Sequence, residues 1–408
     1  MKQLLQFSLV AMLFAGCGSN SNAPEKPAGD SLKHKKRNAP ADSLIQVKAV
    51  TFDTNNIYDR TAAVIAGLNG KAGEYNHFFD SGAWKSNCGF IDSSWAKMSK
   101  SRLSEMRTWS EKEFNSPNKK VTTVFYPFSG PDFLTAVTFF PDPDTLVMLG
   151  LEPVGKLPVI DKMKNKDAEH YVEDLHLSLT DIFGKSYFIT RKMMTNLNSQ
   201  KVNGTLPLLA FFMKRTGNSI TSINYLMRYG NDSIREIPYE TKTDKKPSGA
   251  KINYVANNKL KTLYYFSYDI SDKRFNDTTV FFKYLSGMNH FTTYIKSASY
   301  LLHNSFMSNV RKFILDKSNY VIQDDTGVPF KYFSKDSGIW TTMVYGDYTV
   351  PVKDFGKMRQ QKELTEYFEK KNEGVPKLPF HLGYHWGNKK DVIIFASRKK
   401  AETISPQN

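Results

Sequence analysis

One stretch decides the fold: Val121–Gly155, VTTVFYPFSGPDFLTAVTFFPDPDTLVMLGLEPVG. It is the longest apolar block after the N-terminus, and turn residues interrupt it at regular places. The pattern predicts a strand over Val121–Tyr126, a turn at residues 129–130 and a second strand over Thr145–Leu149. The apolar spacing of Leu134–Phe140 fits a short crossover helix between the two strands, although its Val and Thr residues would also suit a strand.

Helices and strands alternate after this stretch. Lys162–Gly184 carries a continuous apolar stripe that is typical of an amphipathic helix, and Leu206–Arg215 is predicted to form another. Ile223–Tyr229 alternates with a period of two, and Ile234–Tyr239 is a candidate return strand after it. Ala250–Val255 is expected to pair with Leu260–Tyr268 as a second hairpin. We therefore predict an α/β fold, a mixed sheet with helices on its faces, preceded by a small helical N-terminal part. A two-domain α+β arrangement is the alternative.

The C-terminal third continues the pattern. Apolar spacing predicts helices over Phe291–Leu302 and Phe306–Ile314, which lead into a strand over Tyr320–Gln323. Two hairpins are predicted beyond it, one over Trp340–Val352 and one over Phe380–Ser397.

The N-terminus has the features of an export signal. Met1-Lys2 supplies a positive start, and the apolar run Leu4–Ala15 is too short to span a bilayer. Residues 14–17, FAGC, resemble a bacterial lipobox, with Phe14 where that pattern usually has Leu. The resemblance to bacterial envelope lipoproteins implies cleavage before Cys17, its lipidation, palmitate included, and attachment to a membrane through the lipid. An ordinary signal peptide with an incidental Cys17 is the alternative.

Charge and anchoring together define the expected surroundings. The formal net charge of +16 favours anionic envelope components as neighbours. Nucleic acid is not expected as a partner outside the cytoplasm. The lipid bilayer, contacted through Cys17, is the expected partner. Gly18 stands where an Asp would hint at inner-membrane retention, so the outer membrane is the default location within the cell envelope.

The composition along the chain suggests five parts. Residues 1–16 form the signal peptide, and residues 17–43 form a flexible tether rich in Ser, Asn, Pro and Lys that starts with the lipidated Cys. Residues 44–117 form a mainly helical subregion, residues 118–400 the α/β domain with antiparallel hairpins, and residues 401–408 a loose tail.

Cysteine and histidine usage offers little chemistry. With Cys17 lipidated, Cys88 has no partner for a disulfide within the chain and is expected to be a buried, inert side chain. His381 and His385 are four residues apart, but on the predicted strand they would be separated by about 13 Å. No metal site and no cofactor are therefore predicted.

Ser129 follows a predicted strand, as the nucleophile of a serine hydrolase does. Pro127 and Pro131, however, occupy both positions where the nucleophile elbow needs Gly. A serine nucleophile is therefore not predicted at this turn.

Val121–Gly155 also partly resembles the first β-α-β unit of a Rossmann-like sheet of the class I methyltransferase type. Gly130 lies in the turn after the first strand, and Glu152 follows the second strand, where an acid would hold a ribose. Gly130 and Glu152 are the predicted ligand-binding residues. Asp132, at the predicted helix start, disfavours a phosphate there. A small cofactor without phosphate, such as S-adenosylmethionine, would avoid that objection, although such cofactors are cytoplasmic.

Two functional hypotheses follow. The first is a membrane-anchored extracytoplasmic lipoprotein with a binding or structural role. The alternative is an enzyme with a carboxylate-lined cleft at the strand ends of a degenerate Rossmann-like domain. Asp324 and Asp325, which end a predicted strand, would join Asp132 and Glu152 as its candidate catalytic residues, because ligands bind at strand ends in α/β sheets. The enzyme hypothesis predicts that these four carboxylates meet in one pocket.

Overall fold

The structure is a computed structural model, and it describes residues 52–114, 121–185, 202–230, 233–288, 290–333, 338–348, 351, 355, 359–371, 374–385 and 391–399. The predicted signal peptide, the lipidation site Cys17, the tether and the tail 401–408 lie outside the described residues. Within the described part, none of the helices combines the length and the apolar character needed to cross a bilayer.

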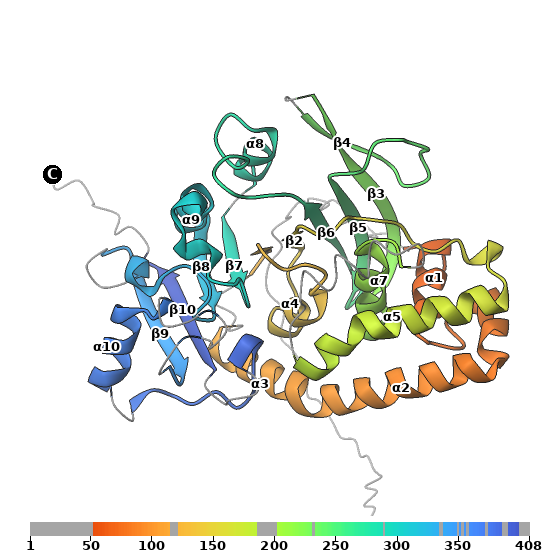
Figure 1. The fold of residues 1–408 in the computed structure, drawn as a ribbon, viewed down its shortest axis with the longest axis horizontal. Coiled ribbons are helices and arrows are strands. Elements are labelled where there is room, and N and C mark those ends of the chain that lie inside the picture. The colour runs from red at the N-terminus through yellow and green to blue at the C-terminus, as the bar shows by residue number, and fades with distance from the viewer. Residues whose placement is uncertain are drawn as a thin grey trace, which may run out of the picture. The chain divides into compact units, whose positions relative to one another are not determined.

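The described residues form one ten-stranded sheet with the order β4-β3-β5-β6-β2-β1-β7-β8-β10-β9 (Figure 1). The strands are β1 Thr123–Tyr126, β2 Thr145–Gly150, β3 Ser219–Tyr229, β4 Ser233–Pro238, β5 Gly249–Ala256, β6 Lys259–Ser267, β7 Phe291–Ile295, β8 Ser318–Gln323, β9 Trp340–Gly346 and β10 Val392–Arg398. Neighbours from β6 through β2, β1 and β7 to β8 are parallel. Antiparallel pairs extend both edges, with β5, β3 and β4 beyond β6, and β10 and β9 beyond β8. The predicted mixed α/β fold class is confirmed.

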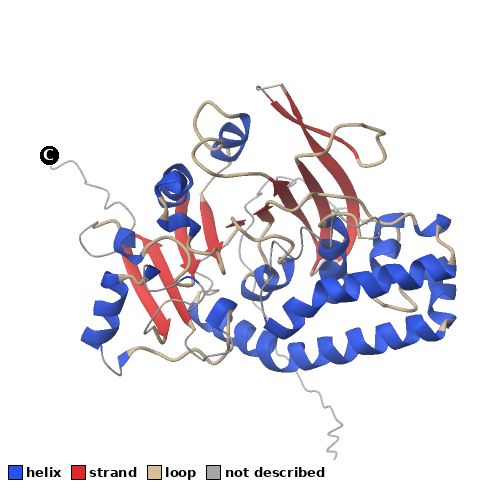
Figure 2. Ribbon diagram, viewed as in Figure 1, coloured by secondary structure: helices blue, strands red, loops and turns tan. Residues whose placement is uncertain are grey.

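Helices cover both faces of the sheet. The helices are α1 Ile57–Ile65, α2 Gly82–Met98, α3 Ser104–Glu113, α4 Phe133–Phe139, α5 Asn165–Lys185, α7 Leu206–Arg215, α8 Val280–Ser286, α9 Ser308–Lys317 and α10 Lys362–Lys371. One hydrophobic cluster packs α1, α2, α3, α4, α5 and α7 against one face of the sheet. A second cluster packs α8 and α9 against the other face. The long helices α2 and α5 lie side by side in the first layer (Figure 2).

The central strands are buried on both faces. Val124 and Tyr126 of β1 belong to the first cluster, whereas Phe125 between them belongs to the second. In β2, Leu146 and Val147 divide in the same way. A strand with helices on both sides needs apolar side chains at every position, which explains the unbroken apolar run in Val121–Gly155. This stretch forms β1, α4 and β2, so the predicted crossover helix is confirmed.

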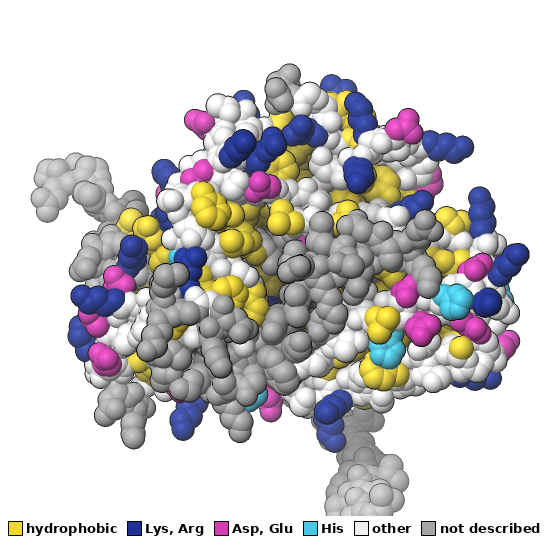
Figure 3. Space-filling view, in the orientation of Figure 1, with side chains coloured by type: hydrophobic (Ala, Val, Ile, Leu, Met, Phe, Trp, Pro, Cys, Tyr) yellow, Lys and Arg dark blue, Asp and Glu magenta, His cyan; other side chains and the backbone are white. Residues whose placement is uncertain are grey.

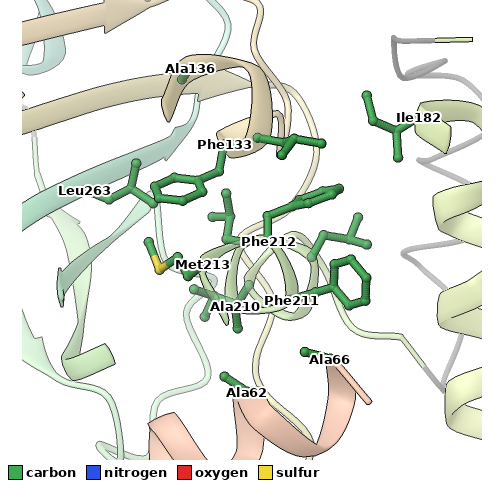
Figure 4. Close-up of a cluster of buried hydrophobic side chains, with 14 of the residues drawn as sticks. Ala62, Ala66, Phe133, Ala136, Ile182, Ala210, Phe211, Phe212, Met213 and Leu263 are labelled. Carbon is green, nitrogen blue, oxygen red and sulfur yellow. The ribbon is translucent and has the colours of Figure 1, made fainter. Parts of the chain in front are cut away.

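Helix α7 lies at the centre of the first layer. Every residue from Leu206 to Lys214 is buried. Phe212 and its neighbours lie between Phe133 of α4 on one side and Ala62 of α1 on the other (Figure 4). Lys214 of α7 is buried and paired with Asp59 of α1 at 2.6 Å, so this helix is fixed by an ion pair as well as by apolar contacts.

The local predictions for the middle of the chain are confirmed. The stripe in Lys162–Gly184 forms α5, and Leu206–Arg215 forms α7 with the predicted bounds. The period-two segments form the antiparallel pairs β3–β4 and β5–β6.

The helix predicted over Phe291–Leu302 is wrong, because Phe291–Ile295 is strand β7. All five of its residues are buried, and it pairs in parallel with β1 on one side and β8 on the other. Its sequence, FTTYI, is rich in β-branched and aromatic residues, which favour strands. Apolar residues spaced by three and four are also produced by a short buried strand followed by an irregular segment, and this caused the error.

The last predicted hairpin is wrong as well, and the return strand of the hairpin before it, 348–352, lies mostly outside the described residues. β9 pairs along its whole length with β10, from Trp340 opposite Arg398 to Gly346 opposite Val392. β10 also pairs with β8, so the last strand inserts between two earlier ones. Residues 380–385, predicted to form most of the first strand of the last hairpin, are not in a strand. Turn residues beside apolar runs suggested local pairing, whereas the observed pairing joins distant segments.

Candidate functional site

A cavity of about 450 Å³ lies at the carboxyl ends of four parallel strands. Its walls include Phe128 and Gly130 after β1, Leu151 and Glu152 after β2, Tyr268–Ile270 after β6, and Lys296–Ser299 after β7. Phe355 and Tyr384, from the C-terminal part, complete the lining.

The topology of the sheet explains this position. From β1 the chain runs through α4 to β2 on one side, while from β7 it runs through α9 to β8 on the other side. The two crossover helices also lie on opposite faces, since α4 belongs to the first hydrophobic cluster and α9 to the second. Where neighbouring strands send their connections in opposite directions, open α/β sheets leave a crevice at the carboxyl ends.

Gly130 and Glu152, the predicted ligand-binding residues, both line this cavity and lie against each other. The Glu152 side chain is buried, at 2% exposure. A Cβ atom placed on Gly130 would lie 3.6 Å from Glu152 Oε2, and one placed on Gly150 only 2.3 Å from it. The Glu152 carboxylate therefore occupies the space that a side chain at position 150 would fill, so this position needs glycine. Tyr265 donates a hydrogen bond of 2.9 Å to the Glu152 carbonyl oxygen and holds its backbone.

The turn after β1 has its donors engaged by the end of β2. The amides of Ser129 and Gly130 donate to the Leu149 carbonyl oxygen, at 2.7 and 3.3 Å. The Ser129 hydroxyl donates to the same oxygen at 3.0 Å. Amides in such a turn could otherwise cradle an anion. Here they fasten the turn to β2, and the Ser129 hydroxyl contacts carbonyl oxygens rather than a base.

Asp132 lines the cavity as part of a buried network. Its carboxylate caps α4 by accepting from the Thr135 amide at 3.2 Å, and it also accepts from the Tyr126 hydroxyl at 2.9 Å. Lys296, which follows β7, completes the network with its Nζ 2.5 Å from Asp132 Oδ2. Burial lowers the pKa of Lys296, while the charge of Asp132 opposes this shift. The pair joins the two strand ends at the centre of the sheet.

Asp324 and Asp325 are not among the residues that line the cavity. They lie behind its wall, where Asp324 accepts from the Ser297 amide at 2.7 Å and Asp325 accepts from the Tyr300 hydroxyl. Burial, followed by the neighbouring charge of Asp325, raises the pKa of Asp324 to about 6. Of the four carboxylates proposed to meet in one pocket, the structure brings Asp132 and Glu152 to it and uses the other two to support the loop after β7.

That loop is strained and heavily braced. Ser297, Ser299 and Tyr300 have φ values of 54°, 52° and 52°, in the left-handed region that non-glycine residues avoid. The Tyr384 hydroxyl donates to the Ser297 carbonyl oxygen at 2.9 Å and lies 2.8 Å from the Ser299 hydroxyl oxygen. Such conformations cost about 1–3 kcal/mol each and gather at ligand sites. The bracing therefore fixes one shape of the cavity wall.

Several lining residues were missed from the sequence. Lys296 was hidden because its strand was predicted as a helix, and Tyr384 was assigned to a hairpin that does not form. For Lys296 a usable signal existed, since the β-branched run of β7 is followed by polar Lys and Ser, as at the other strand ends. Tyr384 offered no such signal, because it reaches the cavity only through tertiary packing.

His381, His385 and Cys88, considered above for metal binding or catalysis, are not among the residues that line the cavity. His385 lies in a short 3-10 turn rather than on the predicted strand, and the His381 ring is 2.6 Å from Asp391 Oδ2. Within the described ranges, no group of three or more His, Cys, Asp or Glu side chains is placed to hold a metal. Cys88 is buried, and burial raises the pKa of its thiol to about 11, in keeping with an inert side chain.

The face drawn in Figure 3 shows hydrophobic side chains gathered near its middle and Lys and Arg side chains at several separate places. Comparisons of the chain with family models, with curated proteins and with solved structures give no match.

Proposed function

We propose that this chain is a cell-envelope lipoprotein, anchored through Cys17, whose α/β domain binds a small ligand in the strand-end cavity. The observation that carries the binding role is the cavity of about 450 Å³ with the buried Glu152 carboxylate in its wall. Pockets that bind small molecules commonly measure roughly 300–1,000 Å³ and combine apolar walls with a few placed polar groups. The lipobox-like residues support the anchoring role.

The polar groups favour a ligand without phosphate. The turn amides that could hold an anion donate to Leu149, and the Lys296 charge is paired with Asp132. Glu152 contributes an acceptor, because a carboxylate has about four lone-pair sites. The cavity thus suits an uncharged ligand that donates hydrogen bonds from hydroxyl or amino groups.

An enzyme is the second candidate. Counted along the chain, the five parallel strands have the order third-second-first-fourth-fifth, which agrees with the start of the Rossmann order and supports the predicted resemblance. Lys296 beside Asp132 could take part in proton transfer at the cavity wall. We favour binding, because Asp324 and Asp325 do not line the cavity and because the predicted compartment lacks cofactors such as S-adenosylmethionine.

The anchoring is tested by Cys17→Ala and by globomycin. Either treatment should leave an unprocessed precursor without palmitate, and the protein should lose its lipid-dependent membrane attachment. Unchanged processing and unchanged palmitate labelling would contradict the lipoprotein assignment.

The binding role is tested by thermal shift on the chain from Cys17 to Asn408, made without its signal peptide. Paired compounds with and without phosphate, such as adenosine and its monophosphate or glycerol and its phosphate, serve as probes alongside neutral amphiphiles. We expect stabilisation by an unphosphorylated compound and its loss in Glu152→Gln. If the phosphorylated compound of each pair stabilises the chain more than the unphosphorylated one, the proposal is wrong.

A further inference from the structure

The cavity has an apolar mouth. Leu151, the residue before Glu152, lines the cavity and yet is 57% exposed. Glu152, by contrast, is 2% exposed. Polarity thus changes over a short distance, from exposed hydrocarbon at the opening to a buried carboxylate.

Apolar side chains continue inward from this mouth. Phe128, Ile270, Leu301 and Met307 belong to the lining, and each also packs in or against the second hydrophobic cluster. This wall is therefore built on the α8–α9 layer of the fold. The polar groups Glu152, Lys296 and Ser297 come from the ends of β2 and β7. The cavity consequently offers an apolar wall and a polar wall to the same occupant.

A single exposed apolar side chain is common on protein surfaces and needs no explanation. Leu177 of α5 is such a case, at 58% exposure, and it is not among the residues that line the cavity. Leu151 differs because it continues the lining of a cavity to the surface. Exposed apolar area that is continuous with a binding cavity indicates a ligand that is itself partly apolar.

Charge narrows the chemistry of the polar end. Glu152 and Asp269 are among the lining residues, and the Lys296 charge is paired with Asp132. An anionic head group would find the Lys296 charge already paired and no amide cradle, since the Ser129 and Gly130 amides donate to Leu149. An uncharged head group with hydroxyls needs neither of these, and it can donate to Glu152.

We infer that the cavity takes a neutral amphiphile, a molecule with a hydroxyl-bearing head group against Glu152 and a hydrocarbon tail that leaves past Leu151. This inference rests on the proposed binding function and names its ligand class. A chain tethered to a membrane by its own lipid would meet such molecules in the bilayer beside it.

The experiment uses the chain from Cys17 to Asn408, made without its signal peptide. The neutral apolar fluorophore N-phenyl-1-naphthylamine reports occupancy, and monocaprylin, caprylate and glycerol compete with it below their aggregation concentrations. Monocaprylin should displace the fluorophore at a concentration at least tenfold lower than caprylate, which has an anionic head group, or glycerol, which has no tail.

Two matched variants locate the site. Leu151→Asp should weaken monocaprylin binding at least tenfold, whereas Leu177→Asp, an equally exposed leucine elsewhere, should change it less than twofold. Unfolding midpoints of both variants check that the fold is retained, and Leu151→Ser replaces Leu151→Asp if that variant does not fold. Glu152→Gln should weaken monocaprylin binding more than fluorophore binding.

The possible outcomes distinguish failure of this inference from failure of the proposed binding function. If glycerol or adenosine stabilises the chain but monocaprylin does not bind, the inference of an amphiphilic ligand is wrong. The proposed binding function would still hold. Absence of binding for all compounds would overturn both. Equal effects of the two leucine variants would contradict a tail that leaves past Leu151. Stronger binding of caprylate than of monocaprylin would contradict a neutral head group.

Discussion

At the residue scale, the pair of Asp132 and Lys296 joins the two strand ends on which the cavity depends. Both side chains are 2% exposed, and their charged atoms are 2.5 Å apart. Taking two charges out of water is costly, so each charge depends on its partner for compensation. The Tyr126 hydroxyl and Thr135 amide add further hydrogen bonds to the carboxylate, which makes Asp132 the centre of the network.

Lys296→Met should therefore destabilise the fold strongly. It leaves the Asp132 carboxylate buried without its cation, which costs about 3–5 kcal/mol in free energy of unfolding. Lys312→Met, in the exposed pair with Asp316, should cost about 0–1 kcal/mol. Urea unfolding measures both, and the double variant Lys296→Met with Asp132→Asn should recover part of the loss. Equal losses in the two single variants would contradict the role of the buried pair.

Gly150 is the second residue on which the site depends. In Gly150→Ala the new Cβ would lie 2.3 Å from Glu152 Oε2 and 2.8 Å from the Tyr265 hydroxyl oxygen, so the carboxylate has to move. We expect at least tenfold weaker ligand binding, measured by fluorophore displacement.

Gly89→Ala in α2 is the control, because nothing lies within 4 Å of its added Cβ. It should leave binding unchanged and stabilise the helix by roughly 0.5–1 kcal/mol. Unchanged binding in Gly150→Ala would show that the position of Glu152 does not matter.

At the element scale, the loop after β7 depends on the acidic end of β8. Asp324 accepts hydrogen bonds from the amides of Ser297 and Thr326, at 2.7 and 3.0 Å. The charged and titratable groups around it are Asp325, which follows it, and Lys296 and Tyr294 on the β7 side. Protonation of Asp324 therefore bears on a segment that forms the cavity wall.

The pH dependence follows from the direction of the shift. The pKa of Asp324 is raised from 3.8 to about 6, so between these values the folded chain binds more protons than the unfolded chain. The stabilising contribution is complete below pH 3.8 and is lost as the pH rises through about 6. The free energy of unfolding can change by up to about 1.4 kcal/mol per pH unit through this group.

Asp324→Asn should remove this component. Urea unfolding at pH values across this interval should show that the free-energy difference between wild type and variant changes with pH, while other titrating groups cancel. The wild type should lose stability relative to the variant as the pH rises. A difference independent of pH would contradict the raised pKa.

At the scale of the whole molecule, two layers of helices enclose the central strands. The cavity opens between β1 and β7, where the crossover helix changes from the first layer to the second. The net charge of +16 belongs to the chain as a whole rather than to this site. On the face in Figure 3, Lys and Arg occur at separate places. We therefore treat the predicted attraction to membranes through charge and the proposed ligand binding in the cavity as separate properties.

The chain made without lipid should bind vesicles that contain phosphatidylglycerol at low salt and leave them at about 1 M salt, where the Debye length falls to about 3 Å. The lipidated protein should stay bound at both concentrations, because its acyl chains do not depend on charge. Co-sedimentation measures both. Equal binding of the unlipidated chain to neutral vesicles would contradict an electrostatic attraction.

Much of the site could be predicted from residues that follow local strands. Gly130 and Glu152 each lie in the turn that follows a strand with a clear apolar run, and parallel neighbours bring their carboxyl ends to the same edge of the sheet. Lys296 was missed although the β-branched and aromatic run before it favours a strand, because the apolar spacing of Phe291–Leu302 was assigned to a helix. Tyr384 reaches the wall from a segment far away in the sequence.

The sequence by itself determined the elements with long or regular patterns, namely β1-α4-β2, α5, α7 and the hairpins β3–β4 and β5–β6. Their signals are local, since side-chain periodicity and turn residues act over a few neighbouring positions. Only the tertiary structure decided that β7 is the central partner of β1 and that β10 lies between β8 and β9. Pairing between distant strands depends on which arrangement buries both faces of the sheet, and no local pattern encodes that choice.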